Sequence, residues 1–218
     1  MLGVSGVRLA AAAAVAWGMA AAGPALAVPF GGVEFPDGAV SFADQVVSYT
    51  PGPGALAPHN DPDAALGVPD SGGAGTYVSL GWGGELVLRF TDNSLTTSGD
   101  STLDLWIFEI GGAVEPTDVY ISVDGSDWVS VGFVGGATAG VDIDAFIGSG
   151  VTLGEQYSYV RLVDRDLRLS GSPYAGADID AVGAISSAAA VALPVPGAVA
   201  LFGLGVAGLA FLRRRPAA

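Results

Sequence analysis

The residues best suited to chemistry in this sequence are carboxylates in short, turn-forming segments. One loop carries an amide and two acids close together, and a predicted strand near the other end carries Asp178 and Asp180. Those two acids are two residues apart, so both project from one face of the strand. Calcium takes about six to eight oxygen ligands, which such loops supply. The sequence therefore predicts a structural Ca²⁺ site, with these residues as its best ligands: Asn60, Asp61, Asp63, Asp178 and Asp180.

A second interpretation of the same acids needs no ion. Asp and Asn cap turns and favour solvated loops in any case. None of the spacings matches an EF-hand, which requires alternating ligands, a glycine at the sixth position and a glutamate at the twelfth. A structural ion and simple turn caps therefore both remain open.

Catalysis is not indicated by the same residues. Glycoside hydrolysis needs two carboxyl groups about 5–10 Å apart across a cleft, and no sequence spacing defines such a pair among 22 acids. Ser–His–Asp catalysis would require His59, the single histidine, which lies on a predicted loop without a nucleophile-elbow motif nearby. We expect a protein that is not an enzyme, with a hydrolase as the more distant alternative.

Aromatic side chains offer a binding site of another kind. Trp82 lies in a glycine-flanked turn, Gly81-Trp82-Gly83-Gly84, where the indole can be exposed. Exposed rings stack on sugar faces, so Trp82, Tyr77 and Tyr174 are predicted to form a ligand-binding platform; the alternative is a structural role for Trp82. Two further tryptophans lie in predicted strands and are expected in the core: Trp106 and Trp128. The nearby arginines are expected to pair with acids of the same domain: Arg161, Arg165 and Arg168.

Composition narrows the classes of partner. The 218 residues carry a net charge of −14, contain neither lysine nor cysteine, and place every acid between Glu34 and Asp180. Such a surface repels phosphate backbones, so nucleic acid is excluded as a partner. Without cysteine there is no disulfide framework and no thiolate metal site.

The elements that position these residues are predicted to be short strands. Glycine occurs 34 times, about twice its usual share of ~7%, which favours many tight turns. Residues 85–90 alternate apolar and polar, 103–110 are apolar on both faces as in a central covered strand, and Asp124-Gly125 forms a hairpin turn. Further strands are expected at 40–42, 46–49, 77–80, 157–163 and 177–185, with a helical turn near 143–147. Residues 28–186 are thus predicted to form an all-β, antiparallel β-sandwich with jelly-roll connections.

Both ends of the chain carry membrane signals. Residues 1–27 read as a secretory signal peptide, with Arg8, an Ala-rich apolar stretch and the small-x-small sequence Ala25-Leu26-Ala27; an uncleaved anchor helix is the alternative. A linker at 187–196 precedes an apolar stretch at 197–212, predicted to be a transmembrane helix, and a basic cytoplasmic tail at 213–218. Arg213, Arg214 and Arg215 would stop transfer and hold the C-terminus in the cytoplasm. The acidic middle is therefore predicted to be exported and first held at the inner membrane.

The tail resembles the C-terminal sorting domains of the PEP-CTERM type. The resemblance rests on a Pro-containing motif, an apolar helix and a terminal arginine cluster. In place of the Pro-Glu-Pro signature the chain has Pro194, Val195 and Pro196, which is similar to the variant signals with a Val-Pro-Leu-Pro-like core. The resemblance implies an exosortase-type enzyme as a processing partner and a final location at the cell surface or in the extracellular matrix.

The middle is similar to the galactose-binding-like (discoidin, F5/8 type C) sandwiches. Six segments carry the likeness in order: Ala65-Leu66-Gly67-x-Pro69-Asp70, Tyr77-Val78-Ser79-Leu80-Gly81-x-Gly83-Gly84, Asp104-Leu105-x-Ile107-Phe108-Glu109, Val119-x-Ile121-Ser122-x-Asp124-Gly125, Tyr159-Val160-Arg161-Leu162-x-Asp164 and Gly176-x-Asp178-Ile179-Asp180-Ala181-Val182. The resemblance implies a sandwich often stabilised by calcium and often used to hold glycans. We therefore expect an exported, non-catalytic binding or structural protein associated with a cell surface or exopolysaccharide, or, alternatively, a specific lectin-like module for polysaccharide.

Overall fold

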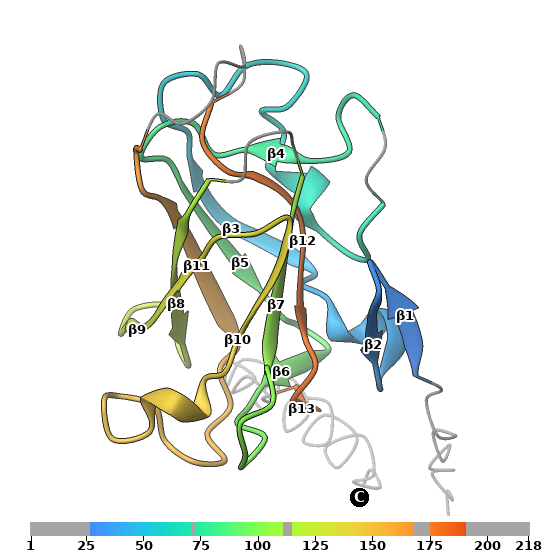
Figure 1. Ribbon diagram of the computed structural model, residues 1–218, viewed down its shortest axis with the longest axis vertical. Helices are drawn as coiled ribbons and strands as arrows, with labels where there is room; N and C mark the ends of the chain where they lie inside the picture. Colours follow the sequence, from blue (N-terminus) through green and yellow to red (C-terminus); the bar gives the residue numbers. More distant parts are fainter. Residues whose placement is uncertain (1–26, 71–72, 111–114, 168–174, 191–218) are drawn as a thin grey trace, which may run out of the picture.

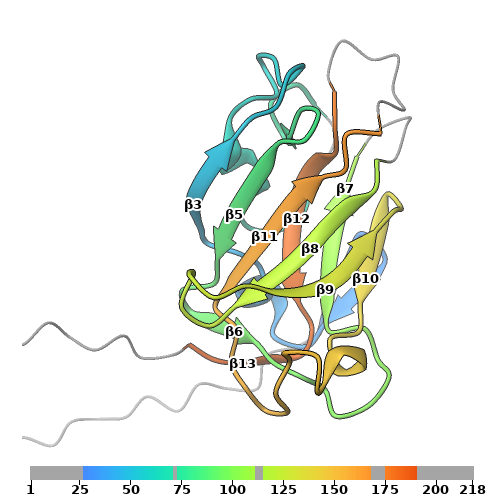
Figure 2. The ribbon, with the colours of Figure 1, turned by 90° about the vertical axis from the view of Figure 1, so that its left-hand side faces the viewer.

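The larger of two antiparallel sheets has five strands. The computed structural model describes residues 27–70, 73–110, 115–167 and 175–190. The strands of the larger sheet run in the order β3 (Gln45–Thr50), β5 (Glu85–Arg89), β11 (Tyr159–Asp164), β8 (Thr117–Ser122) and β9 (Val129–Val134). Figure 2 shows this sheet with its strands side by side. Strands distant in sequence are neighbours, so the connections cross between the sheets.

The smaller sheet has four strands and packs behind the larger one in the view of Figure 2; in Figure 1 it lies to the right of the larger sheet. Its order is β10 (Thr138–Val141), β7 (Leu105–Glu109), β12 (Asp178–Ala184) and β4 (Val78–Ser79). The core between the sheets takes alternate residues from the strands of both, among them Leu86, Leu88, Ile107, Val119, Leu162 and Val182. Alternation of apolar and polar residues is what a strand needs to bury one face and leave the other available.

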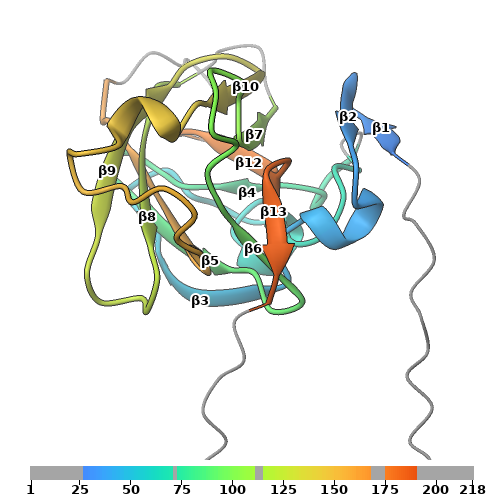
Figure 3. The same ribbon diagram turned by 90° about the horizontal axis from the view of Figure 1, so that it is seen from below.

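A second, smaller apolar cluster covers the other side of the four-stranded sheet. It forms around Phe35, Phe42, Phe108 and Ala181, with the rings of Phe35 and Phe42 4.6 Å apart. The hairpin of β1 (Val28–Phe30) and β2 (Val33–Phe35) and the 3₁₀ turn η1 (Gly38–Ser41) bring two of these phenylalanines to the sheet (Figure 3). Strand β7 is therefore covered on both faces.

The remaining elements lie at the ends of the sandwich. Strand β6 (Asn93–Leu95) pairs with β13 (Ser187–Ala189), side by side in Figure 3. Two further 3₁₀ turns are η2 (Pro62–Ala65) and η3 (Asp144–Phe146). Both turns lie beside acidic residues that enter the candidate sites below.

The all-β, antiparallel prediction for the middle of the chain is confirmed. The strand at 85–90, the covered strand at 103–110, the Asp124-Gly125 hairpin and the helical turn near 143–147 appear as β5, β7, β8–β9 and η3. The strand predicted at 40–42 is wrong. The 3₁₀ turn η1 ends at Ser41 instead, and Phe42, which follows it, packs in the second apolar cluster. The predicted helices at the two ends lie outside the described residues; within the described ranges, no helix is long and apolar enough to cross a membrane.

Glycines around the Trp82 turn are required by close backbone contacts. A Cβ on Gly84 would lie 1.8 Å from the Leu80 carbonyl oxygen and 2.7 Å from the Gly52 nitrogen. These are backbone atoms, which cannot move aside as the end of a side chain can. The turn is therefore fixed against the neighbouring loop.

We predict that Gly84→Ala lowers the free energy of unfolding by about 3 kcal/mol, the upper end of the usual cost of overpacking, since the methyl group must displace main chain. Gly135→Ala is the matched control, because its Cβ would meet only Pro116 side-chain atoms at 4.0 Å. Urea unfolding of the two variants measures the difference. Equal midpoints would show that the turn relaxes at little cost.

Candidate functional site

One acid of the loop at 60–63, Asp61, serves locally as a cap of the 3₁₀ turn η2. Asp61 precedes η2, and its carboxylate accepts a hydrogen bond from the Asp63 backbone N–H at 3.1 Å. Asn60, Asp61 and Asp63 are all exposed. Capping therefore accounts for Asp61, and the role of all three residues as metal ligands stays a prediction.

The two acids of β12 contact different parts of the molecule. Asp178 lies opposite Ser79 of β4 and accepts a hydrogen bond from its hydroxyl group. Burial raises the pKa of the Asp178 carboxyl, while the Ser79 hydrogen bond and the nearby His59 act to lower it. Asp180 lies at a bulge in the β7–β12 pairing, is 3% exposed, and accepts a hydrogen bond from the Asp70 backbone N–H at 3.3 Å.

The predicted aromatic platform is divided by the structure. Tyr77 stacks on His59, with ring centroids 3.9 Å apart and planes 10° from parallel. Trp82 is half-buried in its turn, where its backbone N–H donates to the Pro53 carbonyl at 3.0 Å. Tyr174 lies outside the described residues. One face of Tyr77 is therefore covered, and a joint platform stays a prediction.

A cluster of three aspartates that sequence spacing did not identify as a site forms at the opposite end of β7. Among the described residues, Asp104, Asp142 and Asp144 are the acids whose carboxylate oxygens lie close enough together to share one ion, within 4.8 Å of one another. Asp104 is fully buried and accepts hydrogen bonds from the backbone N–H groups of Ser98 at 3.0 Å and Ile143 at 2.9 Å. The feature of the sequence that could have pointed to this cluster is the spacing of Asp142 and Asp144, which are two residues apart.

Three adjacent carboxylates repel one another, and a cation removes that cost. One oxygen of Asp142 is buried without a hydrogen-bond partner, as a metal ligand would be. Asp144 accepts from the Ser98 and Gly99 backbone N–H groups at 2.9 and 3.1 Å. Oxygen ligands of this kind suit Ca²⁺.

A second acidic feature is a cavity of about 340 Å³ where β7 ends and β12 begins. Its lining includes the acids Asp70, Glu109 and Asp180. Glu109 is 6% exposed, and burial raises the pKa of its carboxyl to about 8, with smaller contributions from the charges of Glu115 and Asp178. A carboxyl group in this state is protonated at neutral pH.

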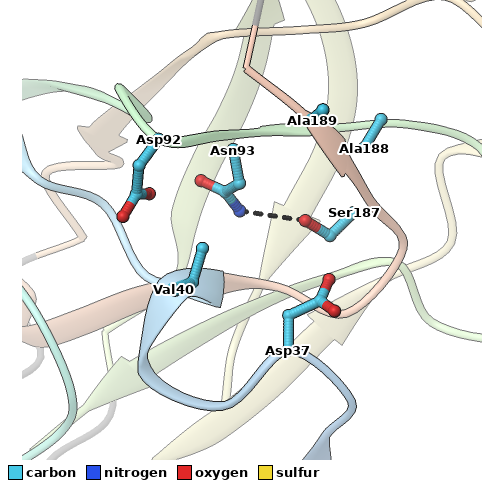
Figure 4. Close-up of a pocket in the computed structure, with 7 residues that line it drawn as sticks. All are labelled: Asp37, Val40, Asp92, Asn93, Ser187, Ala188 and Ala189. Atoms are coloured by element: carbon cyan, nitrogen blue, oxygen red, sulfur yellow. Dashed lines mark hydrogen bonds between the residues drawn. The ribbon is translucent and has the colours of Figure 1, made fainter. Parts of the chain in front are cut away.

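The pocket in Figure 4 has a different character. It encloses about 370 Å³ beside β6 and β13 and is lined by Asp37, Val40, Asp92, Asn93, Ser187, Ala188 and Ala189. Its interior hydrogen bond runs from the Asn93 side-chain amide to the Ser187 hydroxyl at 3.1 Å. This bond joins the two strands, so Asn93 and Ser187 help to hold β13 against β6.

The outer face of the five-stranded sheet carries aromatic rings and arginines. Arg161 lies over the rings of Tyr120 and Trp128, at 4.2 and 4.8 Å from their centroids. Arg89 lies over Tyr159 at 5.3 Å. The expectation that Trp128 belongs to the core is wrong: it is half-exposed, and neither apolar cluster includes it.

The predicted pairing of these arginines with acids is confirmed for two of them. Arg161 lies 3.9 Å from Glu85, and Arg165 lies 3.5 Å from Asp118 and 4.6 Å from the centroid of the Phe133 ring. Arg168 lies outside the described residues. Both ion pairs are long, so their guanidinium groups keep capacity for further hydrogen bonds.

Comparison with known proteins adds a structural likeness. No protein-family model matches the chain, and no curated protein matches it. Among solved structures it is similar to the C-terminal domain of a chitobiase from Bacteroides fragilis, at 14% identity and a TM-score of 0.38, over 66% of this chain and 95% of that one.

Proposed function

We propose that this chain is an exported surface protein whose β-sandwich binds polysaccharide without catalysing a reaction on it. Export is supported by the signal-like sequence at 1–27 and by the apolar segment with its terminal arginines at 197–215. The sequence likeness to galactose-binding-like sandwiches supports a jelly-roll arrangement of this type. Sorting would involve an exosortase-type enzyme acting near Pro194–Pro196 and would leave the protein at the cell surface or in a polysaccharide matrix.

The observation that carries the proposal is the face formed by Tyr120, Trp128, Phe133, Tyr159 and the arginines above them, named here the aromatic face. Tyr159 and Arg161 alternate with the buried Val160 and Leu162, so they point away from the core. Phe133 is 58% exposed.

Planar rings stack on the apolar faces of sugars, and guanidinium groups donate hydrogen bonds to sugar hydroxyls in fixed directions. Three arginines occur in the described part of the chain, and all three lie against rings of this face. Rings carried by three neighbouring strands, β8, β9 and β11, offer contacts to successive units of an extended chain of sugars. The aromatic face is therefore proposed as the polysaccharide-binding surface.

We also propose that Ca²⁺ stabilises the domain at Asp104, Asp142 and Asp144. The support is the close grouping of their oxygens and the buried, unpartnered oxygen of Asp142. When bound, the ion would offset the repulsion of the three carboxylates and link the loops that carry them. This part of the proposal concerns stability and is independent of sugar binding.

Trp128→Ala is expected to weaken polysaccharide binding at least tenfold, about 1.4 kcal/mol, because it removes a ring and frees the Arg161 side chain stacked on it. The measurement is affinity electrophoresis of the purified full-length chain against a panel of neutral and acidic polysaccharides. Trp82→Ala is the aromatic control at the loop predicted from sequence.

Two results would contradict the proposal. Loss of binding in Trp82→Ala with full binding in Trp128→Ala would move the site to the loop platform. Absence of affinity for every polysaccharide in a folded protein, checked by its unfolding transition, would leave a purely structural role.

A further inference from the structure

The cavity at the end of β7 contains an acid whose environment is incomplete. Both carboxylate oxygens of Glu109 are buried, and neither has a hydrogen-bond partner of normal geometry. The backbone N–H groups of Asp178 and Glu115 lie near enough to favour its charged form in part. Burying a carboxyl group without donors is costly, so a ligand that brings donors into the cavity would remove a real deficit.

The charge of the cavity determines the kind of donor. Three acids line it, and the described residues of its lining include no arginine, lysine or histidine. The described arginines lie on the aromatic face of the other sheet, and the chain has no lysine. A cationic ligand would therefore meet several acceptors and, among the described residues of the lining, no competing positive charge.

Geometry separates an ammonium group from a bare metal ion. Calcium holds its oxygens at about 2.3–2.6 Å, which requires them to lie close together, and in the described part of the chain that condition is met by Asp104, Asp142 and Asp144. An ammonium group reaches its acceptors at about 2.7–3.2 Å, so it tolerates more widely spaced oxygens. The cavity, at about 340 Å³, also falls in the range of small-molecule pockets, about 300–1,000 Å³.

We propose that Glu109, with Asp180 and Asp70, binds a primary ammonium group, and that its natural carrier is an amino sugar. The second half of this statement rests on the polysaccharide function proposed above; the first does not. The apolar lining by Pro69, Phe108 and Ile110 would contact the carbon skeleton of the ligand, and Thr138 also lines the wall.

The test compares three sugars that differ at one position. Glucosamine carries the ammonium group, N-acetylglucosamine blocks it, and glucose replaces it with a hydroxyl. Titration calorimetry with the full-length chain is expected to show glucosamine binding at least tenfold more tightly than the other two. In Glu109→Gln, glucosamine binding should fall at least tenfold, while Glu155→Gln, at an exposed glutamate, should leave it unchanged.

Equal binding of glucosamine and N-acetylglucosamine would overturn the proposal, as would glucosamine binding that survives Glu109→Gln. Calcium titration is run in parallel; Ca²⁺ binding that is lost in Glu109→Gln, without any glucosamine response, would assign the cavity to a metal ion instead. A failure of the ammonium site can be told apart from a failure of the proposed polysaccharide function. Glucosamine binding in a protein that binds no polysaccharide would retain the ammonium site and remove its proposed carrier.

Discussion

Glu109→Gln is expected to make the domain more stable at pH 8, by an amount on the order of 5 kcal/mol at most, because it removes a carboxyl group whose ionisation the fold resists. Burial raises the pKa of Glu109 from 4.5 to about 8 in the folded protein. The folded state therefore holds a proton that the unfolded chain has already released. Between these two pKa values the free energy of unfolding falls as pH rises, and above the folded value the loss is complete.

The measurement is urea unfolding of the wild-type chain and Glu109→Gln at pH 5, 7 and 9. The gap between them should be smallest at pH 5, roughly 1 kcal/mol or less, because the carboxyl is protonated in the folded state and only about three quarters ionised in the unfolded chain, whose pKa is near 4.5. It should widen towards pH 9. Glu155→Gln controls for a general change of net charge and should show no such widening. A Gln variant that is less stable than wild type by a constant amount would mean that Glu109 forms hydrogen bonds the amide cannot replace.

This expectation bears on the cavity as a binding site. A group that destabilises the free protein at neutral pH is stabilised by a ligand that favours its ionised form, and the same ligand stabilises the fold. Natural proteins retain such unfavourable groups mainly where function uses them. Glu109 thus lowers the stability of the free protein, and a bound ammonium group would remove that cost.

The strands were predictable because each depends on a local pattern. Glu85–Arg89 alternates, so Leu86 and Leu88 enter the core whatever the neighbouring strand is. The hairpin turn depends on two adjacent residues: Asp124 accepts hydrogen bonds from the backbone N–H groups of Ser126 at 2.8 Å and Asp127 at 3.1 Å, and Gly125 adopts a positive φ of 81°. Such signals need no knowledge of tertiary structure.

The candidate sites were not predictable in the same way, because residues far apart in sequence build them. Glu109 meets Asp70 and Asp180 only through β7–β12 pairing and the bulge at Asp180. A bulge shifts the register by one residue, and sequence alternation alone does not place it. Trp128 illustrates a second difficulty. Its place in a predicted strand suggested that it is buried, but the alternation of residues does not reveal whether the outer face of a sheet is covered by other elements.

Asp104→Ala is expected to lower the free energy of unfolding by about 1–3 kcal/mol, since it leaves the buried Ile143 backbone N–H without its acceptor. The Ser98 N–H is exposed and keeps its second acceptor, Asp144. Asp104 is 0% exposed, and its two oxygens accept from Ser98 and Ile143, which lie in different loops. Its backbone carbonyl also accepts from the Ile185 N–H at 2.7 Å, but that bond survives the substitution. Asp100→Ala is the control, because Asp100 is exposed and accepts from Thr102 within its own turn at 2.8 Å. A loss in Asp104→Ala no larger than in the control would mean that water replaces the carboxylate.

The stability of the protein should also depend on calcium if Asp104, Asp142 and Asp144 form a metal site. If these residues only hold the loops together by hydrogen bonds, calcium should have no effect. Added Ca²⁺ is expected to raise the unfolding midpoint of the wild-type chain, and chelator should reverse the rise, because binding to the folded state alone stabilises it. Asp142→Asn keeps the shape of the side chain but removes a charge from the oxygen that has no partner, so it should abolish the response while costing little stability without the ion. Asp104→Ala should lose both the response and the stability. If the wild-type midpoint is the same with and without chelator, Asp104 serves only to hold its loops together. If the calcium response persists in Asp142→Asn, the ion binds elsewhere. The next residues to replace would then be Asp61, Asp63, Asp178 and Asp180.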